Sequence, residues 1–131
     1  MAGNFLNWID GVPAEVGLIL GNHDGVPRGV LGTLNWVKED GLAGIRLLHH
    51  PDNSDHPSIG GHVHPMVRLR GQGRESFRLP CYWQRKRCLI LPAFGGFTGG
   101  YDIEPADDEK VWVVASGRVV EVARRMVAVG R

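Results

Sequence analysis

The sequence contains few cysteines and no long apolar run, and these two shortages exclude several classes of protein. Two cysteines in 131 residues, Cys81 and Cys88, are too few for the disulfide framework of a small secreted domain. No stretch approaches the roughly 20 consecutive apolar residues of a membrane-spanning helix. The segment from Met1 to Asp10 also lacks the basic start of a signal peptide. We therefore expect a cytoplasmic protein with free thiols and no membrane contact.

The overall composition is that of a globular protein. Apolar residues make up 43% of the chain and charged residues 22%, which are ordinary values for a folded domain. The length of 131 residues fits a single domain spanning residues 1–131. Glycine occurs 19 times, which favours many tight turns over a helical bundle.

Local patterns divide the chain into an α/β front half and a mostly β back half. Apolar positions at helical spacing predict helices over residues 4–10 and 28–40, the second ending at Gly41. Short apolar runs predict buried strands over residues 15–20, 45–48 and 58–61. Further strands are predicted over residues 66–70, 77–83, 88–91, 111–114 and 119–122, with a hairpin turn at Ser116-Gly117. We expect an α/β fold in which sheets pack face to face with helices outside.

All six histidines lie between residues 23 and 64, and most of them follow the three predicted buried strands. The three polar clusters are Gly21-Asn22-His23-Asp24, His49-His50-Pro51 and Gly61-His62-Val63-His64-Pro65. Because the carboxyl ends of strands form the ligand crevice of open α/β sheets, we expect the clusters to meet.

The residue types in these clusters indicate a metal site. Neutral imidazole binds divalent transition metals, and the amide oxygen of Asn22 favours manganese or iron over a structural zinc. The two imidazoles of His62 and His64 are close enough to serve two metals about 3.5–4 Å apart. Each cluster alone also suits a polar turn or a surface loop. The prediction therefore depends on all three occurring in this order.

The three clusters resemble the GNH[DE], H-x-P and GHxH motifs of calcineurin-like metallophosphoesterases. The run from Gly61 to Pro65, with Leu91-Pro92-Ala93-Phe94-Gly95 and Thr98-Gly99-Gly100, resembles the branch of ligase-associated DNA damage response endonucleases or phosphoesterases. The resemblance implies a partial β-sandwich flanked by helices, in α/β/β/α layers, without the first strands of the family.

The resemblance also implies roles for individual residues. One metal would be bound by Asn22, His49 and His62, and a second metal by His64. His23 would act on the substrate phosphate as a catalytic residue, oriented by Asp24. His50 would lie toward the substrate. The complete family site holds two divalent ions, for which manganese is the first expectation and iron or zinc the alternatives.

The reaction implied by the resemblance is hydrolysis of a phosphate ester by attack of a metal-bound hydroxide on phosphorus. We expect a phosphodiesterase or DNA endonuclease in DNA repair, with a phosphodiester such as DNA as substrate. The family branch further implies association with a DNA ligase and a helicase.

The chain departs from the family at its start. The D-x-H and G-D motifs, which supply an Asp, a His and a carboxylate bridging both metals, have no match upstream of Gly21. We therefore interpret the domain as N-terminally incomplete. A fragment, a misplaced start codon and a degenerate copy remain open.

A basic segment bears on the substrate. Between Met66 and Cys88 there are seven basic residues and one acidic residue. We predict that Arg68 and Arg70, two residues apart on one strand face, bind substrate. Aromatic residues interleaved with the charges, which are Phe77, Tyr82 and Trp83, could stack on bases. The alternative is that the arginines face solvent while the aromatic rings pack in the core.

Two other functions remain open from the sequence. The missing motifs favour a non-catalytic nucleic-acid-binding or interaction remnant. A phosphatase acting on small nucleotides would share the same site and differ only in its pocket.

Overall fold

The computed structural model describes residues 2–22, 29, 34–51, 55–96 and 99–129, and the account below concerns these residues. The helical elements are α1 (Ala2–Gly11) and the 3-10 helix η2 (Arg124–Met126). The strands are β1 (Gly17–Ile19), β2 (Asn35–Val37), β3 (Glu39–Leu42), β4 (Ile45–Leu48), β5 (Ser58–Gly60), β6 (Pro65–Arg70), β7 (Ser76–Arg85), β8 (Cys88–Ile90), β9 (Tyr101–Asp102), β10 (Lys110–Ala115) and β11 (Arg118–Glu121).

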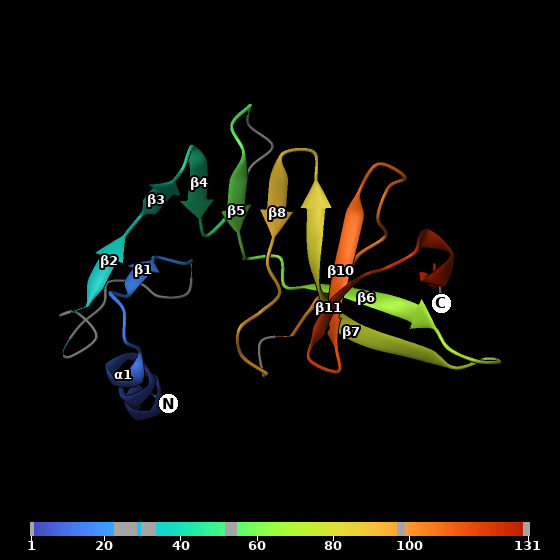
Figure 1. The fold of residues 1–131 in the computed structure, drawn as a ribbon, viewed down its shortest axis with the longest axis horizontal. Helices are drawn as coiled ribbons and strands as arrows, with labels where there is room; N and C mark the ends of the chain where they lie inside the picture. The colour runs from blue at the N-terminus through green and yellow to red at the C-terminus, as the bar shows by residue number, and fades with distance from the viewer. Residues whose placement is uncertain (1, 23–28, 30–33, 52–54, 97–98, 130–131) are drawn as a thin grey trace.

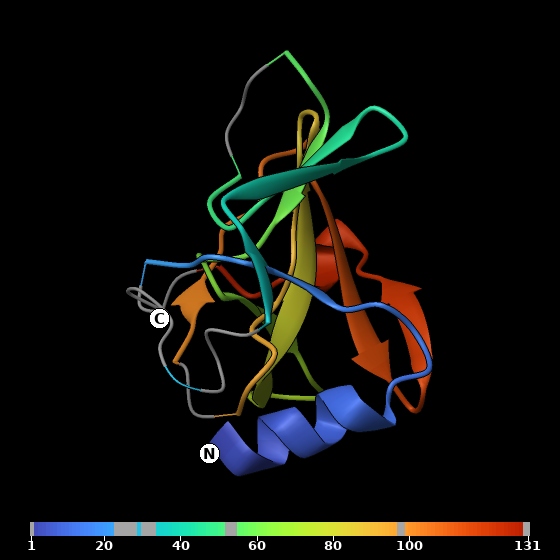
Figure 2. The same ribbon diagram turned by 90° about the vertical axis from the view of Figure 1, so that its left-hand side faces the viewer.

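One large sheet organises the structure. Its strands follow the order β11-β10-β7-β8-β5-β4-β3, and β6 pairs with both β7 and β9 at the side (Figure 1). Strands β4, β5 and β8 are parallel neighbours, so their carboxyl ends lie along one edge of the sheet. Strands β1 and β2 form a separate parallel pair. Helix α1 lies on the side of the molecule where the parallel strands end (Figures 1 and 2).

The core lies on one face of the large sheet. The ten residues of β7 pair with β6 through the first half of the strand and with β8 and β10 through the second half. Every second residue of β7 and β10 points inward, which buries Cys81, Trp83, Val111 and Val113. Burial raises the pKa of the Cys81 thiol to about 12, so this thiol stays protonated at neutral pH.

The fold-class prediction of the sequence is confirmed at the level of a mixed α/β fold made mostly of sheet. The predicted first helix and all eight predicted strands are present, with small differences at their ends. The predicted hairpin turn is also present, since Ser116 and Gly117 adopt φ angles of 51° and 72° between β10 and β11. The two-residue strand β9 was not predicted.

The helix predicted over residues 28–40 is wrong where the structure describes that segment. Strand β2 occupies part of this range and pairs with β1, and the backbone N–H of Leu20 donates to the carbonyl of Val37. Gly41, expected to end the helix, lies within β3 instead. Pairing with β1 and β4 stabilises an extended backbone here and outweighs the weak helical spacing of Leu34 and Val37. The segment 30–33 lies outside the described residues.

A contact between aromatic rings joins α1 to the loop after β8. The ring of Trp8 lies 5.7 Å from the ring of Phe94, in the loop that follows β8. Within α1, the ring of Phe5 stacks with that of Trp8 at 6.0 Å. In the part of the chain that is described, no helix is long and apolar enough to cross a membrane.

Candidate metal centre

Three strand ends supply the polar residues of the candidate site. Asn22 follows β1, His49 follows β4 and His62 follows β5. The parallel register of β4 and β5 places Leu48 beside Gly60, and the backbone N–H of Gly61 donates to the carbonyl of His49 at 3.0 Å. The two histidines are therefore held at the same edge of the sheet by backbone hydrogen bonds.

Gly60 permits the close approach of these strand ends. A Cβ atom at this position would lie 2.3 Å from the carbonyl oxygen of Leu48 and 2.7 Å from Cδ of Pro51. Both distances are far below a normal van der Waals contact, and one of the obstructing atoms belongs to the backbone. Only glycine fits between β4 and the turn at Pro51 without moving the residues that carry the histidines.

Three side chains converge at this edge. The Nε2 atom of His49 lies 2.9 Å from Oδ1 of Asn22 and 3.2 Å from Nδ1 of His62. An amide oxygen only accepts hydrogen bonds, so Nε2 of His49 must carry a proton to bond with Asn22. The same proton would also have to form the hydrogen bond to the lone pair on Nδ1 of His62. A cation among the three atoms would satisfy all three lone pairs at once.

The spacing of these atoms fits a metal centre. Ligand atoms about 2.1 Å from a metal, at angles of about 90° to 109°, lie about 3.0 to 3.4 Å from one another. The separations of 2.9 Å and 3.2 Å at His49 are close to that range. Two imidazole nitrogens and one amide oxygen also form a donor set that suits manganese, iron or zinc. The residues present therefore fit a divalent ion.

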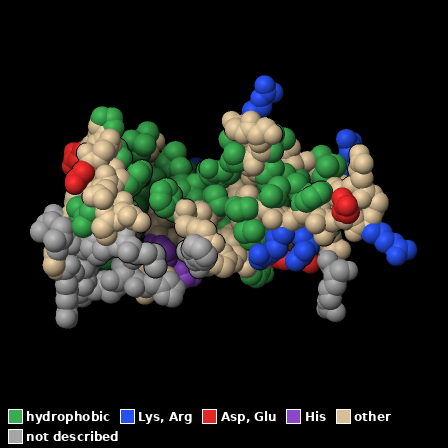
Figure 3. Space-filling model, turned by 90° about the horizontal axis from the view of Figure 1, so that it is seen from below, with side chains coloured by type: hydrophobic (Ala, Val, Ile, Leu, Met, Phe, Trp, Pro, Cys, Tyr) green, Lys and Arg blue, Asp and Glu red, His purple; other side chains and the backbone are tan. Residues whose placement is uncertain are grey.

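The other histidines of the prediction lie around this cluster. The ring of His50 packs 4.5 Å from the ring of His62, inclined by 32°. His62 and His64 both adopt left-handed backbone conformations, with φ angles of 68° and 53°. Such conformations are unfavourable for histidine, and residues held in them cluster at functional sites. Figure 3 looks onto this side of the molecule and shows histidine side chains at the surface.

Some of the predicted residues are not brought into the cluster. His23 and Asp24 lie outside the described residues. His64 contributes a carbonyl oxygen that accepts a hydrogen bond from the N–H of Tyr101 at 3.0 Å. Across residues 2–22, 29, 34–51, 55–96 and 99–129, no three His, Cys, Asp or Glu side chains group as a metal site. The described part of the cluster therefore consists of two histidines and an amide, without a carboxylate.

The predicted substrate arginines differ in their surroundings. Arg68 forms an ion pair with Asp102 at 3.2 Å, and Arg78, directly opposite on β7, pairs with the same carboxylate. The hydrogen bond from Arg78, with the positive charge of both arginines, holds the pKa of Asp102 below its ordinary value. Among the described residues, Arg70 has no carboxylate partner, and it lines a polar groove of about 850 Å³ with Arg74.

The three aromatic residues of the basic segment differ in their exposure, since Trp83 is buried, Tyr82 half-buried and Phe77 exposed. Trp83 is 7% exposed and belongs to the core, in agreement with the alternative reading of this segment. The guanidinium of Arg85 lies over the Trp83 ring at 4.5 Å. Phe77 is exposed, but it lies on β7 opposite Leu69, beside the turn that joins β6 to β7.

A second groove begins at the histidine cluster and was not predicted from the sequence. It has a volume of about 960 Å³ and is lined by His62, Val63, Trp83, Arg85, Tyr101, Asp102, Glu104, Ala106 and Glu109. Its wall at β9 depends on Gly100, where a Cβ would lie 2.3 Å from Cγ of Met66. The sequence signal for this wall is the glycine-rich run before Tyr101.

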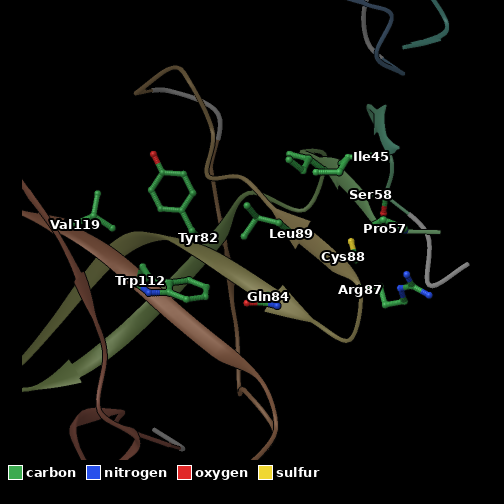
Figure 4. Close-up of a pocket in the computed structure, with 11 residues that line it drawn as sticks. Ile45, Pro57, Ser58, Tyr82, Gln84, Arg87, Cys88, Leu89, Trp112 and Val119 are labelled. Atoms are coloured by element: carbon green, nitrogen blue, oxygen red, sulfur yellow. The ribbon is translucent and has the colours of Figure 1, made fainter. Parts of the chain in front are cut away.

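A third hollow lies on the opposite face of the large sheet. It has a volume of about 600 Å³ and is lined mainly by apolar side chains, among them Tyr82, Leu89 and Trp112 (Figure 4). These side chains alternate with the buried residues of β7 and β10, so they point away from the core. None of its lining residues belongs to the histidine cluster, and we do not assign it to the candidate site.

Comparison with known proteins supports the fold. The crystal structure of the Pseudomonas putida nuclease MPE is similar to this chain, with a TM-score of 0.67 and 36% sequence identity. The similarity covers 82% of this chain and 54% of that protein, so the chain spans about half the length of its structural neighbour. A scan against models of protein families and a search of curated proteins found no match. The chain therefore shares a mixed α/β, partial nuclease-like fold with that protein.

Proposed function

We propose that this chain carries part of the active site of a metal-dependent phosphoesterase that hydrolyses phosphodiesters in nucleic acid. The observation that carries the proposal is the convergence of Asn22, His49 and His62 at one edge of the sheet. The similarity to a nuclease at 36% identity supports hydrolysis of a phosphoester in nucleic acid as the general activity. A DNA endonuclease in DNA repair, in contact with a ligase and a helicase, remains the finer prediction from sequence resemblance.

The described cluster would hold one divalent ion through Asn22, His49 and His62, with manganese as the first candidate and iron or zinc as alternatives. When bound, such an ion supplies positive charge that activates water and neutralises phosphate oxygens. His64 would serve a second ion, as the sequence resemblance implies. The cluster is partly exposed, so a substrate phosphate has access to it.

The remaining roles belong to side chains of this chain. His50 packs against His62 and would orient that ring or contact the substrate. His23, held by Asp24, would supply a proton to the leaving oxygen. Among the described residues Arg70 has no carboxylate partner and would contact a phosphate of the strand, whereas Arg68 is held by Asp102. These assignments give each residue a separate test.

The experiment that tests the function is hydrolysis of a chromogenic phosphodiester by the purified chain with Mn²⁺. We expect activity above background for the native chain and for His56→Ala, whose histidine is exposed and lies outside the three motifs. His62→Ala should abolish the activity. Equal activity in His62→Ala and the native chain would show that the cluster is not the catalytic site.

A second candidate function is a non-catalytic nucleic-acid-binding module. The observation that favours it is that no carboxylate joins the two histidines within the described residues. A carboxylate that bridges two cations offsets their mutual repulsion, so a cluster without one holds a pair of ions poorly. This candidate predicts oligonucleotide binding without hydrolysis of either a chromogenic diester or the oligonucleotide.

A further inference from the structure

The groove that begins at His62 offers a binding surface beside the candidate metal centre. His62 belongs to both the cluster and the groove wall, so a molecule with its phosphate at the cluster would extend into the groove. The volume of about 960 Å³ lies within the range of about 300 to 1,000 Å³ usual for ligand pockets. The groove is therefore large enough for a part of the substrate bigger than a phosphate group.

Tyr101 presents an aromatic ring in this groove. Its side chain is exposed, with 60% of the residue surface accessible, while its backbone N–H is bonded to the carbonyl of His64 at 3.0 Å. Pairing of β9 with β6 fixes the backbone at this position. The backbone that carries the ring is thus held near the histidines, and the side chain is exposed. An exposed ring on a fixed backbone can stack on another aromatic group at small entropic cost.

The charges along the groove disfavour a second phosphate there. Asp102, Glu104 and Glu109 all line it. Glu109 accepts hydrogen bonds from Nε1 of Trp83 at 2.8 Å and from Arg85 at 3.0 Å. Asp102 is likewise paired with arginines, so the charge of the wall is largely balanced and not basic. Such a wall does not attract additional phosphate but can accept hydrogen bonds from the N–H groups of a base.

From these observations we propose that the groove binds an unpaired nucleobase, stacked on Tyr101, next to the phosphate held at the histidine cluster. This inference rests on the proposed function and narrows it. The substrate is a nucleic acid strand with an accessible base, and not a small alkyl or protein phosphoester. Tyr101 is the residue that distinguishes these substrates, because stacking requires an aromatic ring on the ligand.

The test measures binding in EDTA, so that it does not depend on catalysis. The probes are a fluorescently labelled oligothymidylate of about 12 nucleotides and an abasic strand of equal length, which keeps the phosphates and lacks the bases. We expect the native chain to bind the oligothymidylate more tightly than the abasic strand. Tyr101→Ala and Tyr101→Leu should weaken oligothymidylate binding by about tenfold and leave abasic binding unchanged, while Tyr101→Phe binds as the native chain does.

The control is Val120→Ala, which truncates an exposed apolar side chain on β11, outside both grooves, and should change neither affinity. Equal affinity of the native chain for both strands, no binding of either strand, or unchanged binding in Tyr101→Leu would overturn the proposal. Failure of the proposed function is a separate outcome, because it appears as absent hydrolysis of a chromogenic diester that has no base.

Discussion

The Nε2 atom of His49 lies 3.2 Å from Nδ1 of His62, although 13 residues separate the two histidines in the chain. The contact exists because β4 and β5 run parallel and in register, so that both strands end at the same level. Oδ1 of Asn22 approaches the same nitrogen from a third strand. Since one proton cannot satisfy both contacts of His49, this arrangement is better matched to a bound cation than to hydrogen bonding alone.

The first prediction concerns which of the two adjacent histidines is a metal ligand. Nε2 of His49 points at Oδ1 of Asn22 and Nδ1 of His62, whereas His50 packs its ring against His62. We expect His49→Ala to weaken Mn²⁺ binding by at least about tenfold, as measured by isothermal titration calorimetry. His50→Ala, the neighbouring comparison, removes a ring that packs on His62 and not a ligand, so it should lose less affinity than His49→Ala. A larger loss in His50→Ala than in His49→Ala would reverse the assignment.

The second prediction concerns two consecutive glycines at the end of β5. A Cβ at Gly60 would meet the Leu48 carbonyl at 2.3 Å, whereas a Cβ at Gly61 would meet nothing within 4 Å. We expect Gly60→Ala to lower the free energy of unfolding by about 2 kcal/mol or more, because β4 and β5 must move apart. Gly61→Ala is the matched control and should change the free energy of unfolding by less than about 0.5 kcal/mol.

Urea denaturation followed by circular dichroism measures both glycine variants. The same variants also test the link between strand spacing and the metal centre. Gly60→Ala should lose the stabilisation that Mn²⁺ gives to the native chain, since the histidines on β4 and β5 no longer meet. Retention of that stabilisation would mean that the metal is bound elsewhere.

The sequence predicted the location of the cluster well because strand ends follow a simple rule. Asn22, His49 and His62 each come directly after a short apolar run, and parallel strands place such residues at one edge. Runs rich in apolar, β-branched and aromatic residues also made β7 and β10 predictable. In these cases local pattern and tertiary environment favour the same structure.

Other features depended on partners that local patterns do not reveal. The segment around Val37 has residues at helical spacing, but its pairing with β1 makes it a strand. Tyr101 lies near the histidines because the two-residue strand β9 pairs with β6. In this register Tyr101 is opposite Pro65, which comes 36 residues earlier in the chain. Nothing in the spacing of Tyr101 and His62 along the chain indicates that they share a groove.

The third prediction compares the two arginines proposed to bind substrate. Arg70 has no carboxylate partner among the described residues, whereas Arg68 is paired with Asp102 at 3.2 Å. We expect Arg70→Ala to weaken oligonucleotide binding and to reduce the slope of log K against log salt by about 0.7. Arg68→Ala should have a smaller effect, because its charge is already offset. Fluorescence anisotropy over a range of salt concentrations measures both. Equal slopes for Arg70→Ala and the native chain would remove Arg70 from the binding surface.

The last prediction concerns Glu109 and the acid stability of the fold. Partial burial acts to raise the pKa of Glu109, but hydrogen bonds from the backbone N–H of Ala106, from Trp83 and from Arg85 outweigh it and lower the pKa. A carboxyl group with a lowered pKa in the folded state stabilises the fold above its ordinary pKa of about 4.3, and this contribution disappears as pH falls through the folded pKa. Glu109→Gln should therefore lower the free energy of unfolding by about 1 to 3 kcal/mol at pH 7 and make the loss of stability in acid less steep.

Urea denaturation between neutral and acidic pH measures the effect, with Glu75→Gln, an exposed carboxylate between β6 and β7, as the control. Parallel pH profiles for Glu109→Gln and the native chain would mean that these hydrogen bonds do not depend on the charge of the carboxylate.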